Sequence, residues 1–193
     1  AVTASVTGND STTSGGALTY AKTSDPAHGS VTVNADGSYT YTPATNFSGT
    51  DSFTYTVTDA ASGETLTRTV SLTVTPVSDA PTVTASASGN EDTAIPLTIT
   101  PALTDTDGSE TLSIQISGLP VGSVLTNTAG DTLTITSGSI TLTPAQLAGL
   151  TLTPPVNFNG NIALTVTAIA TDGTAAPART SNALNITVTP VDD

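Results

Sequence analysis

The chain has 193 residues, and its 16 acidic side chains against three basic ones give a formal net charge of −13. A field of this sign disfavours nucleic acid and anionic membrane surfaces as partners and favours divalent cations. The chain has no cysteine, which excludes disulfides and thiol chemistry, and no segment approaches the roughly 20 apolar residues of a membrane span.

Period-two alternation begins early in the chain and predicts β-strands. Residues 30–43, SVTVNADGSYTYTP, predict a hairpin with its turn at 34–37. Two further strands are predicted at 51–59 and 67–76. Their inward-facing residues are then Phe53, Tyr55 and Val57 in the first and Val70, Leu72 and Val74 in the second.

The second half repeats this alternation. Strands are predicted in TLSIQISGL, DTLTITSG, IALTVTAIATD and ALNITVTP. Only TPAQLAGL (143–150) predicts a helical turn, with Thr143 as N-cap and Pro144 at the first helical position. Many short strands with close turns predict an all-β chain of antiparallel sandwiches.

Three pairs of similar segments indicate an internal duplication. VTASVTGN (2–9) matches VTASASGN (83–90), YTPATNFSGTDSFTYTV matches LTPPVNFNGNIALTVTA, and LTVTPVSD matches ITVTPVDD at the end. The spacing between copies grows along the chain, so the second copy carries about 30 additional residues. We therefore predict two domains, residues 1–79 and 80–193, joined through PVSDAP.

The acidic motifs of the second copy point to a family. It has a DxDG element at Asp105, Asp107 and Gly108, an ATDG element at 170–173, and a terminal TVTPVDD. In these it resembles a cadherin-like domain. The first copy, with DPAHGSVTVNADGSYTYTP and NFSGTDSFTYTVTD, resembles the cadherin-like repeats of very long bacterial surface adhesins.

This resemblance implies Ig-like β-sandwiches joined end to end, with Ca²⁺ at the junctions. It also implies an RTX-type adhesin secreted by a type I system to the bacterial surface and linked to biofilm formation. At the junction between the copies, the implied ligands are Asp79, Asp105, Asp107 and Asp172, with Asn9 and Asp10 contributed by the first domain. Glu91, Asp92, Asp192 and Asp193 would serve the next junction, and Asp59 would face a preceding neighbour.

The chemistry of these side chains independently suits calcium. Ca²⁺ takes about 6–8 oxygen ligands, and carboxylates that converge without a basic partner would otherwise repel one another. The alternative for Asp105 and Asp107 is a solvated turn, since Asp-Gly pairs form turns on their own. Glu110 has no counterpart in the family pattern and is expected to face solvent.

The expected function is that of a monomeric, calcium-stiffened extender contacting neighbouring repeats, with any cell-surface or matrix ligand bound through other domains. The alternative is a carbohydrate- or peptide-binding module built by the additional residues near 110–140. We do not expect an enzyme: His28 lies in a short loop, SDPAHGS, and no nucleophile is paired with a base.

Overall fold

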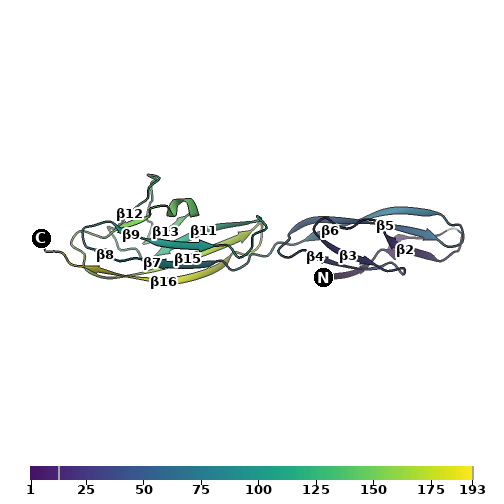
Figure 1. The fold of residues 1–193 in the computed structure, drawn as a ribbon, viewed down its shortest axis with the longest axis horizontal. Helices are drawn as coiled ribbons and strands as arrows, with labels where there is room; N and C mark the ends of the chain where they lie inside the picture. Colours follow the sequence, from purple (N-terminus) through teal and green to yellow (C-terminus); the bar gives the residue numbers. More distant parts are fainter. Residues whose placement is uncertain (13, 193) are drawn as a thin grey trace. The chain divides into compact units, whose positions relative to one another are not determined.

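The computed structural model describes residues 1–12 and 14–192, which form β-strands and two short 3-10 helices. The chain divides into two compact units, Ala1–Pro76 and Val77–Asp193 (Figure 1). This boundary lies three residues before the position expected from the sequence, because Ser78, Asp79 and Ala80 all hydrogen-bond to the second unit.

Unit 1 is a sandwich of two three-stranded sheets, ordered β1-β4-β3 and β2-β5-β6. Its strands are β1 (Val2–Ser5), β2 (Leu18–Lys22), β3 (Gly29–Val33), β4 (Ser38–Pro43), β5 (Gly49–Asp59) and β6 (Thr65–Val74), with a 3-10 helix η1 (Thr7–Asn9) after β1. All pairs in unit 1 are antiparallel.

Aromatic side chains form most of the core of unit 1. The buried members are Val6, Tyr20, Val31, Tyr39, Tyr41, Phe53, Tyr55 and Val57. The predicted hairpin is confirmed: the Gly37 backbone N–H donates to the Asn34 carbonyl over 2.9 Å, and Gly37 has a positive φ of 82°. His28 is exposed in the turn before β3, as expected for a loop residue.

Unit 2 has more strands and a larger aliphatic core. The strands of unit 2 are β7 (Thr82–Ser86), β8 (Gly89–Asn90), β9 (Ile95–Pro96), β10 (Thr98–Ala102), β11 (Glu110–Ser117), β12 (Val124–Thr126), β13 (Ser139–Leu142), β14 (Thr151–Thr153), β15 (Gly160–Asp172) and β16 (Ala178–Thr189). The sheets are β13-β11-β15-β16-β8, β12-β14-β9 and β10-β7. All ladders are antiparallel except the short pairing of β8 with β16, which is parallel.

The predicted helical turn is the 3-10 helix η2 (Pro144–Leu147). The Gln146 side-chain carbonyl accepts the Thr143 backbone N–H over 2.9 Å, which closes the N-terminal end of the turn. Parts of the additional segment enter the core, since Leu119, Leu125, Ile140 and Leu142 are buried. This segment therefore contributes packing to unit 2 rather than forming a separate module.

Ladder registers show which strands of the two units correspond. β2 pairs with β5 from Leu18 opposite Asp59, and β11 pairs with β15 from Glu110 opposite Asp172. The next strand, β6 or β16, then returns antiparallel along β5 or β15. Val2 of β1 lies opposite Tyr41, and Ile95 of β9 lies opposite Leu152, the residue that matches Tyr41 in the repeated sequence, so β1 corresponds to β9.

The predicted match between 2–9 and 83–90 is therefore wrong as a structural equivalence. Residues 83–86 lie in β7, which pairs with β10, whereas β1 takes the place of β9. In the described part of unit 1 no strand takes the place of β7. The additional length of unit 2 is accordingly split, with one part before β9 and another between β11 and β15.

Candidate metal centre

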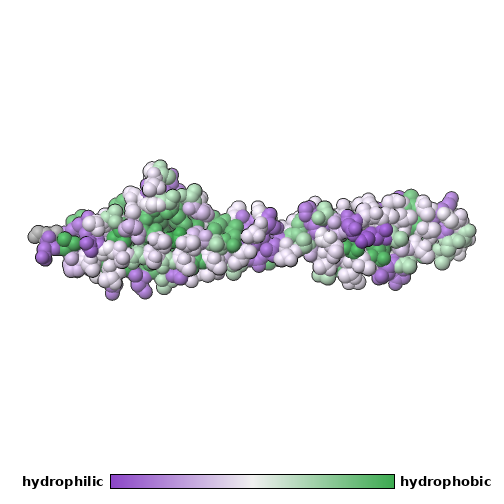
Figure 2. Space-filling model, in the orientation of Figure 1, coloured by the Kyte–Doolittle hydropathy of each residue, from purple (hydrophilic) through white to green (hydrophobic). Residues whose placement is uncertain are grey.

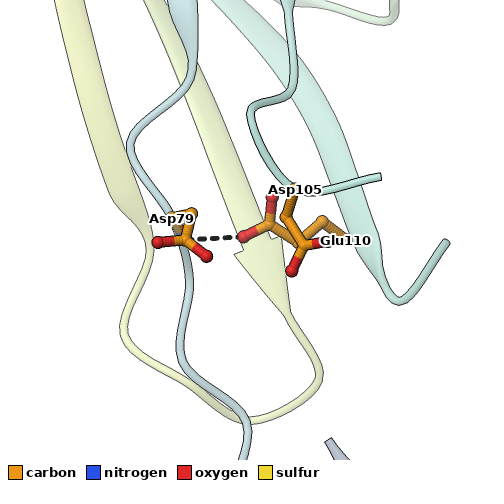
Figure 3. A group of neighbouring side chains, drawn as sticks. All are labelled: Asp79, Asp105 and Glu110. Atoms are coloured by element: carbon orange, nitrogen blue, oxygen red, sulfur yellow. Dashed lines mark hydrogen bonds between the residues drawn. The ribbon is translucent and has the colours of Figure 1, made fainter. Parts of the chain in front are cut away.

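Three carboxylates converge at the end of unit 2 where its chain begins. Oxygens of Asp79, Asp105 and Glu110 all lie within 4.8 Å of one another, and the last two side chains are buried. Asp79 belongs to the extended segment before β7, Asp105 to the loop after β10, and Glu110 to the first position of β11 (Figure 3). The cluster thus joins three segments that are separate in sequence.

Backbone hydrogen bonds hold these segments together. The Asp79 backbone N–H donates to Glu110 Oε1 over 2.6 Å, which fixes the initial segment against β11. The Asp107 backbone N–H donates to Asp105 Oδ1 over 2.9 Å, and the Thr104 hydroxyl donates to the Ala80 carbonyl over 3.0 Å. The loop 103–109 therefore presents the Asp105 carboxylate from a closed turn.

Asp172 lies beside this cluster because it is directly opposite Glu110 in the β11–β15 ladder. It is 3% exposed, and its backbone N–H donates to the Ser78 hydroxyl over 3.0 Å. Asp172 Oδ2 and Glu110 Oε2 are buried without a hydrogen-bond partner among the described residues. A buried carboxylate oxygen without a donor is costly, so two such atoms at adjacent positions call for a positive partner.

No described Lys, Arg or His side chain pairs with these carboxylates; the one ion pair found among residues 1–12 and 14–192 joins Lys22 and Asp25. Carboxylate oxygens are the ligands that Ca²⁺ prefers. The converging oxygens of Asp79, Asp105 and Glu110, with the unpartnered oxygen of Asp172 on the position opposite Glu110, fit the ligand chemistry of a calcium ion.

Asp107 stands apart from the cluster. Its carboxylate accepts the Ser109 hydroxyl over 2.6 Å and the Ser109 backbone N–H over 2.7 Å. These hydrogen bonds lower the pKa of Asp107 from its ordinary value. In this geometry Asp107 caps its own turn and is exposed.

The residues expected at a following junction gather at the opposite end of unit 2. Glu91 is 5% exposed and accepts the Val191 backbone N–H over 2.8 Å and the Asn159 side-chain amide over 3.2 Å. Asp92 Oδ1 accepts the Asn157 backbone N–H over 2.9 Å. Glu91 therefore fastens the C-terminal segment; Asp192 is exposed, and Asp193 lies outside the described residues.

In unit 1, Asp10 lies beside Asp59, and both line one cavity of about 590 Å³. Asp59 ends β5, so this end of the unit is opposite to the one that β6 leaves at Val74. The expectation that Asp10 faces the following domain is therefore wrong. The reason is the direction of β1, whose following loop corresponds to the loop that holds Asp105. Asn9 ends η1, and its side chain lies outside the described part of the structure.

The Asp59 carboxylate already has donors within unit 1. The hydroxyls of Ser14 and Thr12 and the backbone N–H of Ala61 all hydrogen-bond to it. These hydrogen bonds hold the pKa of Asp59 well below its usual range. Asp10 differs, because its Oδ2 is buried without a partner among the described residues.

Glu110 is the residue that the sequence interpretation missed: it was expected to face solvent and is 8% exposed within the cluster. A signal for it exists. Glu110 is in phase with Leu112, Ile114 and Ile116, so the alternation of β11 places its side chain on the inner face. The absence of a family counterpart outweighed that periodicity.

Comparisons with known proteins support a cadherin-like fold. Residues 1–76 match the family described as bacterial cadherin-like domain. No curated protein sequence matches the chain. In the residues that the structure describes, no helix combines the length and the apolar character needed to span a bilayer.

Several solved structures are similar across most of the chain. Protocadherin Gamma B2 extracellular cadherin domains 3–6 are 10% identical with a TM-score of 0.50, covering 91% of this chain and 40% of that one. The protocadherin gammaB7 EC3-6 cis-dimer structure is 14% identical with a TM-score of 0.50, covering 91% and 41%. The chain thus spans about two fifths of these relatives, and the all-β prediction of two tandem sandwiches is confirmed.

Proposed function

We propose that the chain is a non-catalytic structural segment of an extracellular bacterial adhesin, and that it binds Ca²⁺ at the Asp79 end of unit 2. The observation that carries this proposal is the pair of buried, unpartnered oxygens on Glu110 and Asp172 beside the carboxylates of Asp79 and Asp105. The bacterial cadherin-like match of residues 1–76 supports the adhesin setting.

The ion would fix the segment by which the chain enters unit 2. Asp79 is exposed on an extended stretch with no strand of its own, and it approaches β11 through one backbone hydrogen bond. A cation shared by Asp79, Asp105 and Glu110 would add the free energy of ion binding to this hydrogen bond and to those that Ser78 and Ala80 make with unit 2. Motion of the segment 77–81 against unit 2 would then be suppressed, which is how calcium would stiffen an extender.

Secretion would make this stiffening conditional. Extracellular modules bind calcium with dissociation constants of about 10⁻⁴–10⁻³ M, so their sites fill outside the cell and stay largely empty in the cytosol. Bound cations would also reduce the electrostatic repulsion within a protein of net charge −13.

Isothermal titration of Ca²⁺ into the chelator-treated full chain tests this proposal. We expect binding at the Glu110 site, and Glu110→Gln should weaken that binding by about 10-fold or more because it removes one charged ligand. Asp131→Asn is the matched control, since Asp131 is an exposed unit 2 carboxylate outside the cluster. Equal calcium affinity in the wild type and Glu110→Gln would overturn the assignment of the site.

A further inference from the structure

The turn that precedes β15 carries the only Asn-Gly pair of the chain, Asn159-Gly160. Each of the other nine asparagines is followed by a residue with a side chain. Because glycine has no Cβ, its backbone nitrogen can approach the side chain of the preceding residue more closely than that of any other residue type. An Asn-Gly pair is therefore the point where a side-chain amide is most open to attack by the neighbouring backbone nitrogen.

The surroundings of this pair leave it accessible. Asn159 is exposed and lies directly before Gly160, the first residue of β15. A Cβ added at Gly160 would meet no atom within 4 Å, so the space beside the reacting groups is open. Gly160 also has a φ of +119°, a backbone conformation that residues with a side chain rarely adopt. Neighbouring side chains therefore do not shield the pair, and its second position favours glycine.

Unit 1 contains the same turn without the reactive asparagine. NFSG (46–49) and NFNG (157–160) precede corresponding strands, since the final glycine begins β5 in the first and β15 in the second. The first residues of the two turns have φ of 65° and 58°, and the final glycines have φ of 120° and 119°. Ser48 stands where unit 2 has Asn159, so the turn itself does not require asparagine at this place.

The side chain of Asn159 supports a buried carboxylate. Its amide nitrogen donates to Glu91 Oε2 over 3.2 Å, and Glu91 is 5% exposed. The other oxygen of Glu91 accepts the backbone N–H of Val191, in the segment that leaves β16, over 2.8 Å. Figure 2 shows hydrophilic side chains gathered at this end of unit 2. One carboxylate thus holds both the turn before β15 and the segment after β16.

We propose that Asn159 is a site of spontaneous deamidation, and that its modification loosens the segment that leaves β16. The backbone nitrogen of Gly160 attacks the side-chain carbonyl carbon of Asn159 and passes its proton, through water, to the departing nitrogen. That nitrogen leaves as ammonia, which closes a cyclic imide between the two residues. One water molecule then opens the imide at either carbonyl and gives aspartate or isoaspartate. Water is the only co-reactant.

The product places a negative charge beside Glu91. A carboxylate oxygen takes the position of the Asn159 amide nitrogen, which lies 3.2 Å from Glu91 Oε2, and it has no N–H to donate. Both groups are ionised at neutral pH and repel each other, and the burial of Glu91 limits screening by water. Glu91 then no longer holds the turn and Val191 together. This site lies at the opposite end of unit 2 from Glu110, so the proposal does not depend on calcium binding there.

Peptide mapping by mass spectrometry tests the reaction on the full chain, incubated at neutral pH and physiological temperature. The peptide that holds Asn159 should gain the mass difference between an amide and a carboxylic acid, and isoaspartate should accumulate beside aspartate. We expect this conversion to be at least about 10-fold faster than at Asn161 or any other asparagine, because only Asn159 precedes glycine. Conversion at Asn159 no faster than at the other asparagines would overturn the proposal.

Two substitutions test the consequence of the reaction. Asn159→Asp reproduces the charge of the product, and Asn159→Ser is the matched control because unit 1 carries serine in this place. Amide hydrogen exchange at Val191 should be about 3-fold faster or more in Asn159→Asp than in Asn159→Ser, since only aspartate places a charge beside Glu91. Equal exchange at Val191 in the two variants would show that the modification does not loosen this segment and would overturn that part of the proposal.

Discussion

Five carboxylates are buried in the described part of the chain, and four of them differ clearly in the donors that surround them. Asp51 and Glu91 receive hydrogen bonds from their own unit on both oxygens. Glu110 and Asp172 each keep one oxygen without a donor among the described residues. The first pair therefore fastens local structure, whereas the second pair is suited to hold a cation.

Asp51 offers a residue-level prediction. Its carboxylate accepts the backbone N–H groups of Ala27, His28 and Ser52 and the Tyr41 hydroxyl, at 2.8–3.0 Å. Asp51→Asn should lower the free energy of unfolding of unit 1 by about 2 kcal/mol, because an amide nitrogen would face backbone donors. Chemical denaturation followed by tyrosine signals measures this, with the exposed Glu64→Gln as a control that should change little.

The pH dependence of this loss has a definite sign. Burial alone would raise the pKa of Asp51, but the hydrogen bonds from Ser52, Tyr41, His28 and Ala27 outweigh it and lower the pKa below 3.8. The stability that Asp51 contributes is therefore present above about pH 4 and lost as the pH falls through the depressed pKa. The stability difference between wild type and Asp51→Asn should therefore narrow as the pH falls below the ordinary pKa of an aspartate, and a difference that stays constant throughout the acid titration would contradict this account.

At the scale of elements, the hairpin of β3 and β4 depends on one backbone conformation. Gly37 has a φ of +82°, and a Cβ there would lie 2.4 Å from Thr7 Cγ2 and 3.0 Å from Tyr20. The hairpin turn consequently packs against both η1 and β2, and only glycine satisfies the dihedral and the contact together.

Gly37→Ala should destabilise unit 1 by about 2–4 kcal/mol, from left-handed strain and from steric overlap. Gly63→Ala is the matched control, since Gly63 has a φ of +74° but nothing within 4 Å of an added Cβ. It should cost only about 1 kcal/mol. Thermal melts of both variants measure the difference. Equal losses of stability would show that steric overlap with Thr7 and Tyr20 does not contribute to the effect of Gly37→Ala.

Local elements were predictable from the sequence for a physical reason. The turn at 34–37 and the helical turn after Thr143 depend on glycine, asparagine, proline and capping residues that act within a few positions. Strand direction was not predictable, because period-two alternation reads the same both ways along a strand. That is why VTASVTGN was equated with VTASASGN, although β1 and β7 differ in partner and in place within their sandwiches.

The same limit explains the outcome for the candidate site. Asp79, Asp105 and Asp172 were identified from their order along the chain and the structure brings them to one end of unit 2. Asp10 was assigned to the wrong end because its strand was aligned with β7. Residue type and spacing thus identified most of the carboxylates at this end of unit 2. The position of Asp10 in unit 1 could be assigned only from the pairing of the strands.

For the whole molecule, two separate cores imply two unfolding transitions. All four tyrosines, at positions 20, 39, 41 and 55, belong to unit 1, so the near-ultraviolet tyrosine signal reports on that unit alone. Calorimetry reports on both. The tyrosine signal and calorimetry together therefore assign each unfolding transition to one unit.

Calcium should act on these transitions unequally. With about 10 mM Ca²⁺ and a dissociation constant near 10⁻⁴ M, ion binding stabilises unit 2 by about 2.7 kcal/mol, which raises its Tm by roughly 10 °C. In unit 1, the Asp59 carboxylate already accepts hydrogen bonds from the Thr12 and Ser14 hydroxyls and the Ala61 backbone N–H. The tyrosine transition should therefore move by no more than about 2 °C. In Glu110→Gln the calorimetric shift should shrink while the tyrosine melt stays unchanged. A calcium-dependent shift that appears first in the tyrosine signal would place the ion beside Asp10 and Asp59 instead, where Asp10 Oδ2 also has no described partner.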